Sequence, residues 1–463
     1  MLEQLSSTGI NVSNLKIDKT PPPNNRERIA NPKNAGDFYL RASISLQKGD
    51  VRSAINDYGK AIELDSNFID AYMSRGVAFT EVEDWSKAIA DFDEIIARPS
   101  GDFKVTAYSN RGASRAQEGD KQGAMNDLTQ AIRLDPKNAA AYTNRGFVRA
   151  ELGDRQGAIE DSIQAIRLNS KQAGPYINRG NVRAELGDRQ GAIEDFTQAI
   201  RLDPKQAGAY YNRGNVRYKS GDKRGAIEDY TQAIRLAPKQ ANPYNNRGNV
   251  RAELGDRQGA IEDYTQAIRL DPKDVAAYYN RGRTRSKSGD RQGAIEDYTQ
   301  AIRLAPEQAG LYNNRGELRY SLGDKQGAVE DYTQAIRLDP KQVASYINRG
   351  NVRVELGDRP GAIEDFTQVI RLDPKDAAAY NNRGALRYGL GDRQDAIEDF
   401  TQAIRFDPKF AFAYRSRGVV RADLDDKQGT LKDYQEAARL FLEQKDMDSY
   451  NALLEVIKKL QSN

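Results

Sequence analysis

Residues 207–240 of this chain read AGAYYNRGNVRYKSGDKRGAIEDYTQAIRLAPKQ, and this stretch decides the fold. Each half carries apolar or small residues at the spacing of one helical face. Between the halves stand Gly221, which suits the position just after a helix, and Asp222, which suits an N-cap. Pro238 then ends the second half, because proline cannot continue a helix. The stretch therefore predicts a helix–turn–helix unit.

The unit recurs along the chain. The string Asn-Arg-Gly returns every 34 residues from Gly112 to Gly384, and Gly418 continues the series behind Ser-Arg. One step is two residues longer, near Pro99, and an earlier copy is anchored by Ala42. Self-similarity at this period is typical of repeat architectures. We expect twelve units, at residues 35–68, 69–104, 105–138, 139–172, 173–206, 207–240, 241–274, 275–308, 309–342, 343–376, 377–410 and 411–444.

The two ends of the chain lie outside the repeats. Residues 1–34 contain a Pro-Pro-Pro-Asn-Asn run and few apolar residues, so we expect this segment to be mostly disordered. Residues 445–463 place Tyr450, Leu453 and Ile457 on one helical face. Because the open end of a repeat stack needs a cap, we expect a C-terminal capping helix there.

The unit resembles the tetratricopeptide repeat (TPR) over residues 35–444. Counted from Ala207 as position 1, the matching residues are Tyr210 at position 4, Gly214 at 8, Ala226 at 20, Tyr230 at 24, Ala233 at 27 and Pro238 at 32. The resemblance implies an all-α fold, a right-handed α-solenoid (superhelix) of about twelve units. In that family the first helices line the inner surface and the second helices the outer one. One hairpin cannot bury its own apolar stripe, so neighbouring units must stack.

Composition and charge exclude several classes of function. The 463 residues include no Cys and no His, and the net charge is +3. Disulfides, thiolate metal sites, ordinary zinc sites and histidine-based catalysis are therefore excluded. The carboxylates occupy repeated positions, whereas catalysis needs a unique convergent set, so we expect no enzyme, no cofactor and no metal.

The distribution of charged and apolar residues also predicts the partners and the location. We expect no nucleic acid partner, because the basic residues alternate with acidic ones and form no large basic surface. No apolar run approaches the length of a membrane span, so we expect no direct membrane insertion. The first residues lack the pattern of a secretory signal, and we expect a cytoplasmic location.

Three charged positions depart from the TPR pattern. Position 7 is Arg in every repeat, position 11 is Arg from Arg115 through Arg421, and position 23 is Asp from Asp57 to Asp433. Because each Asp accompanies arginines, we favour a structural ladder of partly buried Arg–Asp pairs. The alternative is a column of arginines that binds phosphate or carboxylate groups.

Position 6 supplies the candidate binding residues, which we name the asparagine stripe. It consists of Asn110, Asn144, Asn178, Asn212, Asn246, Asn280, Asn314, Asn348 and Asn382. Position 9 adds further candidates on the same helical face, namely Asn181, Asn215, Asn249 and Asn351. In the TPR family this face lines the concave groove. An amide both donates and accepts, so it can pair with a peptide bond in both senses.

These residues predict a non-enzymatic scaffold or adaptor that binds extended polypeptide segments along the asparagine stripe. The pattern resembles the asparagine ladder in the TPR superhelix of the enzyme that adds N-acetylglucosamine to Ser and Thr. Alternatively, the asparagines bond to the neighbouring repeat or to water. Two other functions stay open: an assembly factor for a multiprotein complex, possibly at a membrane, that docks by its ridges or convex face, and a substrate-recruiting partner of a separate transferase. The oligomeric state is open as well.

Overall fold

The computed structural model describes residues 30–99, 101 and 103–462, and it divides into two units. Unit 1 ends at Leu254, and unit 2 begins at Gly255. This boundary falls inside the repeat at 241–274, between its two helices, which the repeat pattern did not predict. The expected disorder of residues 1–34 concerns a segment of which residues 1–29 lie outside the described residues.

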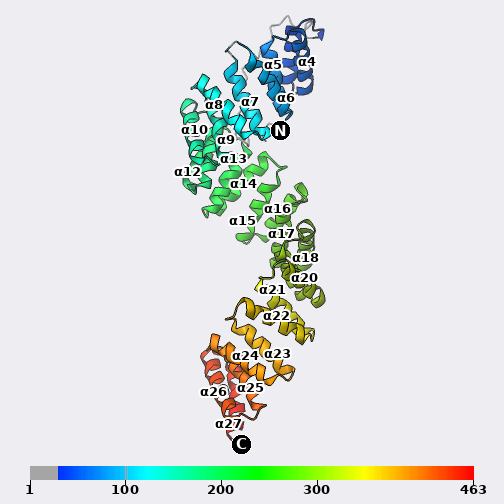
Figure 1. The fold of residues 1–463 in the computed structure, drawn as a ribbon, viewed down its shortest axis with the longest axis vertical. Helices are drawn as coiled ribbons and strands as arrows, with labels where there is room; N and C mark the ends of the chain where they lie inside the picture. The colour runs from blue at the N-terminus through cyan, green and yellow to red at the C-terminus, as the bar shows by residue number, and fades with distance from the viewer. Residues whose placement is uncertain (1–29, 100, 102, 463) are drawn as a thin grey trace. The chain divides into compact units, whose positions relative to one another are not determined.

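Unit 1 is built from antiparallel helix pairs, each followed by the next pair in chain order (Figure 1). Its helices are α3 (Ala35–Gln47), α4 (Val51–Leu64), α5 (Ile69–Glu81), α6 (Trp85–Ala97), α7 (Lys104–Glu118), α8 (Lys121–Leu134), α9 (Ala139–Glu151), α10 (Arg155–Leu168), α11 (Ala173–Glu185), α12 (Arg189–Leu202), α13 (Ala207–Lys219), α14 (Lys223–Leu236) and α15 (Ala241–Glu253).

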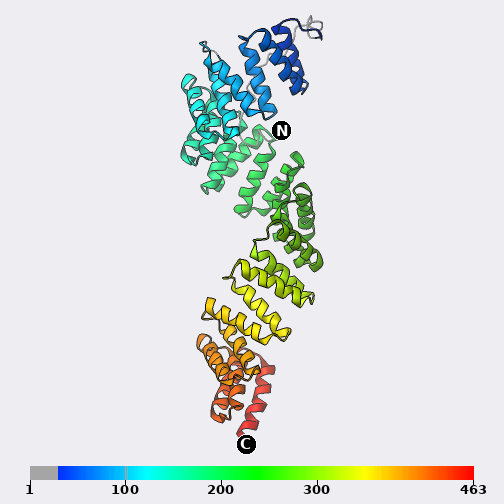
Figure 2. The same ribbon diagram turned by 45° about the vertical axis from the view of Figure 1, so that its right-hand side comes forward.

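Unit 2 continues the same pattern, as the turned view in Figure 2 also shows. Its helices are α16 (Arg257–Leu270), α17 (Val275–Ser288), α18 (Arg291–Leu304), α19 (Ala309–Ser321), α20 (Lys325–Leu338), α21 (Val343–Glu355), α22 (Arg359–Leu372), α23 (Ala377–Gly389), α24 (Arg393–Phe406), α25 (Ala411–Ala422), α26 (Lys427–Glu443) and α27 (Met447–Ser462). No strand occurs among the described residues, so the all-α repeat fold is confirmed.

The turn of each hairpin forms as the sequence predicts. After α13, Gly221 takes a left-handed φ of 89°, and the Asp222 main-chain N–H donates to the Arg217 carbonyl at 2.9 Å. The Asp222 side chain then caps α14 by accepting a hydrogen bond from the Gly225 N–H at 2.9 Å. The N-cap fixes the first residue of the second helix and therefore the register of its buried face.

Small residues let the two helices of a hairpin approach closely. A Cβ atom built on Gly214 would lie 2.9 Å from the Tyr230 ring, so no larger residue fits there without movement. Ala226 and Ala233 are completely buried beside that ring, and Tyr230 itself is 1% exposed. Tyr230 and Ala226 form one such apolar cluster with Val250 of the next repeat, so the buried surface of one hairpin is covered by its neighbour.

The last helix covers the end of unit 2. Leu453 and Ile457 of α27 are buried against α26, where they join Phe441 in one apolar cluster. Leu460, further along the same helix, stays 37% exposed.

Candidate functional site

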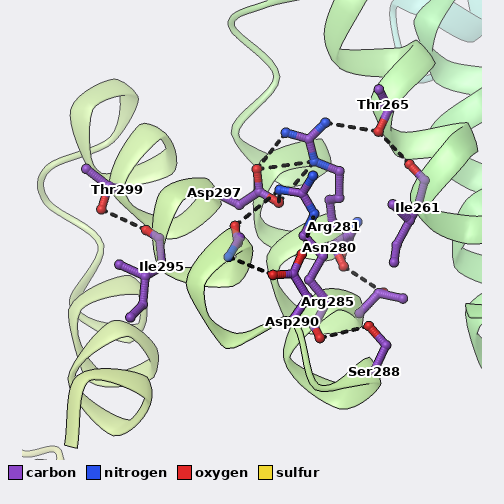
Figure 3. A network of polar contacts seen from close by, with 12 residues as sticks. Ile261, Thr265, Asn280, Arg281, Arg285, Ser288, Asp290, Ile295, Asp297 and Thr299 are labelled. Carbon is purple, nitrogen blue, oxygen red and sulfur yellow. Dashed lines mark hydrogen bonds and ion pairs between the residues drawn. The ribbon is translucent and has the colours of Figure 1, made fainter. Parts of the chain in front are cut away.

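The Arg–Asp ladder forms as bidentate ion pairs inside the hairpins. In the repeat at 275–308, Arg281 donates from Nε and Nη2 to the Asp297 carboxylate at 3.0 and 2.6 Å (Figure 3). Arg285 donates from Nη1 to the same carboxylate at 3.0 Å. Asp297 is only 2% exposed, so two arginines satisfy one buried carboxylate. The structural interpretation of these charges is confirmed.

The ladder also joins neighbouring repeats. The remaining guanidinium nitrogen of Arg281 donates to Thr265 Oγ1 of the preceding repeat at 3.0 Å (Figure 3). Arg315 bonds to Thr299 in the same way at 3.1 Å. At Asp91 of the repeat at 69–104, burial raises the pKa of the carboxyl, although the ion pair with Arg75 opposes the effect. The position-7 arginines of unit 2 thus bond both to their own Asp and to the preceding repeat, and they are not a column of open cations.

In unit 1 the asparagine stripe bonds to the preceding repeat. Asn178 donates from Nδ2 to the Thr143 carbonyl at 3.0 Å, and Asn212 donates to Asn181 Oδ1 at 2.9 Å. Asn110 lies 3.7 Å from the Met73 sulfur. Each contact reaches position 5 or position 9 of the repeat before it. These asparagines therefore act as braces between neighbouring first helices.

Asn246 contacts two residues of the preceding repeat. Its Nδ2 donates to Asn215 Oδ1 at 2.9 Å and lies 3.1 Å from the Tyr211 hydroxyl. Asn215 Oδ1 also accepts a hydrogen bond from the Tyr230 hydroxyl at 2.8 Å. Burial raises the pKa of the Tyr230 phenol, so the hydroxyl stays protonated and can donate. The network links the stripe to the aromatic core.

Two members of the stripe are nearly inaccessible. Asn144 is 2% exposed and Asn178 is 5% exposed, so neither side chain offers much surface to a ligand. Asn144 lies in the repeat whose position 24 is Ser162, and Asn178 lies in the next repeat. Ser162 is small and buried, whereas the other repeats have an aromatic residue or leucine at this position. Asn144, Asn249 and Asn280 also interact with neighbouring groups.

In unit 2 three members of the stripe have no such bond. The side chains of Asn314, Asn348 and Asn382 are half-buried and form no hydrogen bond with any described residue. Asn351, the predicted residue at position 9, is exposed and likewise unbonded within the described ranges. These residues lie on α19, α21 and α23, the first helices of three successive repeats. Their amides are open to a partner.

One pocket in unit 1 gathers four of the predicted residues. It has a volume of about 390 Å³ and is lined by Asn178, Asn181, Asn212 and Asn215. Phe147 and Phe196 supply an apolar part of the wall. Its charged lining is balanced, with Glu151 and Glu185 against Arg189 and Lys219.

A second pocket lies in unit 2 between α17, α18 and α19. Its volume is about 350 Å³, and its wall includes Asn314 together with Arg283, Lys287, Arg291 and Glu317. Only Asn314 belongs to the predicted site; the three cations were missed. A signal was present, because Arg283 is the one cation that any repeat carries at position 9.

Comparison with known proteins supports the repeat assignment. The family described as "TPR repeat" matches at residues 42–82, 112–153, 180–221, 214–255, 248–289 and 350–391. The "Tetratricopeptide repeat" description matches at residues 279–343 and 377–410. Tetratricopeptide repeat protein 36 of Xenopus tropicalis is 42% identical over 101 residues, which are 22% of this chain and 43% of that protein. The chain therefore spans less than half of that relative's length.

Solved structures give weaker likenesses. The crystal structure of YrrB, described as a TPR protein with an unusual peptide-binding site, is 24% identical with a TM-score of 0.37 and covers 40% of this chain and 96% of its own. The structure of Pseudomonas aeruginosa pilF is 21% identical with a TM-score of 0.42, and the match covers 44% of this chain and 93% of the pilF chain.

No described helix has the length and apolar character to cross a membrane. No group of three or more Asp or Glu side chains among the described residues is placed to hold a metal ion.

The family matches cover most of residues 42–410, and the structure shows the repeated hairpins with small residues between their helices. This chain therefore belongs to the tetratricopeptide repeat family.

Proposed function

We propose that this chain is a non-enzymatic scaffold that holds extended polypeptide segments, and that Asn314, Asn348 and Asn382 contact the main chain of the ligand. TPR repeats suit a role in protein–protein interaction. The observation that carries the proposal is the unbonded state of these three amides among the described residues. They repeat at one position in three successive first helices.

The chemistry of the amide fits a peptide ligand. Each asparagine can donate to a peptide carbonyl and accept from a peptide N–H, whatever the ligand's side chains are. Packed helices lie about 8–10 Å apart, and an extended chain rises about 3.3 Å per residue. One asparagine per repeat therefore meets about every third residue of the ligand. The affinity should grow with ligand length.

The bonded asparagines of unit 1 are poorer candidates. Binding a ligand through Asn246 requires breaking its contacts with Asn215 and Tyr211. Each lost hydrogen bond costs about 0.5–1.5 kcal/mol, which offsets what the ligand contributes. The open amides of unit 2 carry no such cost.

The test compares two triple variants of the full chain on an array of synthetic, unstructured peptides. In the first, Asn314→Ala, Asn348→Ala and Asn382→Ala remove the open amides. In the matched control, Asn110→Ala, Asn212→Ala and Asn246→Ala remove bonded ones from the same repeat position. We expect the first variant to bind about tenfold to a hundredfold more weakly, since three bonds of about 0.5–1.5 kcal/mol are lost.

The control separates binding from folding. We expect the unit 1 variant to melt at a lower temperature and to keep its peptide binding. We expect the unit 2 variant to melt like the parent. Unchanged binding by the unit 2 variant contradicts the proposal and favours docking by the ridges or the convex face.

A further inference from the structure

The pocket in unit 2 differs from the rest of the first-helix face in its charge. Arg283, Lys287 and Arg291 line it with a single opposing carboxylate, Glu317. None of these three cations forms an ion pair with a described residue. We name them the cationic pocket. The pocket in unit 1 carries two acidic and two basic residues, so the excess of cations distinguishes the pocket in unit 2.

Arg291 has no ion pair with a described residue because the acidic residue that pairs with its counterparts in other repeats is absent. In five other repeats, the cation at position 17 pairs with an acidic residue at position 13 of the next repeat. Examples are Lys223 with Glu253 at 3.1 Å and Lys325 with Glu355 at 3.1 Å. For Arg291 the corresponding residue is Ser321, which lines the same pocket and carries no charge. The partner of Arg291 is therefore missing.

The same pairing pattern leaves Lys287 without an acid. Lys287 stands at position 13, where its counterparts Glu185 and Glu355 accept ion pairs from Arg155 and Lys325. The cation before it in the pattern is Arg257, so a like charge stands where an opposite one is usual.

Arg283 adds the third charge at the wall of the pocket. Its guanidinium carbon lies 5.9 Å from the centre of the Tyr279 ring, and the side chain is exposed. The aromatic ring orients the guanidinium without neutralising it. Tyr298 also lines the pocket, and its phenol has a pKa raised by burial, so a hydroxyl donor stands beside the cations.

We propose that the cationic pocket receives anionic side chains of an extended polypeptide that lies along the asparagine stripe. The inference rests on the proposed function, because Asn314 belongs to both the stripe and the pocket wall. Three cations against one carboxylate complement an acidic segment, and guanidinium groups bind carboxylate or phosphate oxygens in pairs. The ligand class is thus narrowed to segments that carry Asp, Glu or phosphorylated residues.

The test measures the anisotropy of two short fluorescent peptides, one of alternating Gly and Glu and one of alternating Gly and Gln. We expect the Glu peptide to bind the full chain about tenfold more tightly, and this preference to shrink as salt is raised. The variant with Arg283→Gln, Lys287→Gln and Arg291→Gln should lose the preference. The matched control, Arg269→Gln, Arg303→Gln and Arg337→Gln, removes three exposed cations from second helices and should keep it.

A separate variant supplies the missing partner instead of removing charge. Ser321→Glu places a carboxylate where Glu355 meets Lys325, so it should pair with Arg291 and weaken the Glu peptide several-fold. The Gln peptide should bind this variant as it binds the parent. A Gly–phosphoserine peptide that outcompetes the Glu peptide assigns the pocket to phosphorylated segments rather than acidic ones.

The outcomes that overturn the proposal are distinct. Equal affinities for the Glu and Gln peptides, with both lost in the Asn348→Ala, Asn382→Ala variant, remove the role of the cationic pocket and leave the proposed function standing. Binding of neither peptide through those asparagines removes the proposed function itself. Tighter binding of labelled polyuridylate than of the Glu peptide, lost in the triple Gln variant, assigns the cations to nucleic acid and contradicts the inference.

Discussion

The two units use the same residue at the same repeat position for different purposes. In unit 1, Asn246 bonds to Asn215 and Tyr211 of the preceding repeat. In unit 2, Asn348 follows Glu317 at the corresponding place and bonds to no described residue. An asparagine at this repeat position is therefore bonded in one repeat and open in another, so the position alone does not decide its availability. Asn382 follows Asn351 and is also unbonded, which residue type alone does not explain.

The largest expected effect concerns the ladder, which is common to both units. Asp229→Ala in unit 1 removes a carboxylate that accepts bonds from Arg213 and Arg217, and Asp331→Ala does the same in unit 2. Each should lower the free energy of unfolding by about 3–5 kcal/mol, because buried arginine charge is left unpaired. Denaturant unfolding followed by circular dichroism measures the loss.

The control for the ladder is Glu228→Ala, the exposed neighbour of Asp229 on α14. It should change stability by less than about 0.5 kcal/mol. If only one of the Asp229→Ala and Asp331→Ala variants loses unfolding free energy, the two units differ in their Arg–Asp ladder and not only in their asparagines. That result contradicts the view that the ladder is common to both units.

The second effect sets the bonded asparagine against the open one. Asn246→Ala should cost about 1–2 kcal/mol, because the partly buried groups of Asn215 and Tyr211 lose their partner. Asn348→Ala should be neutral within about 0.5 kcal/mol. Urea unfolding midpoints of the two single variants measure this difference in stability. Equal midpoints contradict the distinction between bonded and open asparagines.

The third change transplants a brace. Glu317→Asn gives Asn348 the neighbour that Asn215 provides for Asn246, at the same spacing in the sequence. We expect a gain of about 0.5–1 kcal/mol in unfolding free energy and weaker peptide binding. A variant that gains stability but binds peptides as before shows that Asn348 is not a ligand contact.

The smallest effect is a pH dependence. Burial raises the pKa of both the Tyr230 and the Tyr298 phenols. The folded state therefore favours the neutral phenol, so this stability is complete below the unfolded pKa of about 10 and is lost as the pH rises above it. Tyr298→Phe should reduce the alkaline loss, and Phe196 shows that the position accepts phenylalanine. Urea midpoints at pH 8 and pH 11 test this.

The same pair sharpens the comparison at neutral pH. Tyr230 donates to Asn215, whereas the Tyr298 hydroxyl has no hydrogen bond to a described residue. Tyr230→Phe should then cost about 1 kcal/mol at pH 8, and Tyr298→Phe should cost less. Equal costs at that pH mean that the Tyr230 bond contributes nothing measurable.

Much of the fold follows from local sequence. The Gly-Asp turn and the small residues fix hairpins such as α13 and α14, and one Asp beside two Arg in a repeat predicts the ladder. The unit boundary does not follow, because RAELGDRQGAIED at 251–263 is identical to 183–195, where no boundary occurs. The cationic pocket does not follow from any single repeat either, because the missing partner of Arg291 lies in the next one.

In unit 2, the bond from each position-7 arginine to a threonine of the preceding repeat makes stability a property shared between neighbours. Arg315 holds its own Asp331 and also Thr299, so losing one repeat weakens the one beside it. Within unit 2, each inner repeat is therefore stabilised by contacts with two neighbouring repeats, whereas the last repeat has a neighbouring repeat on one side only. Amide protons should therefore exchange first near α26 and α27 and last in the middle helices, and unfolding should spread inward from the end as a moving front.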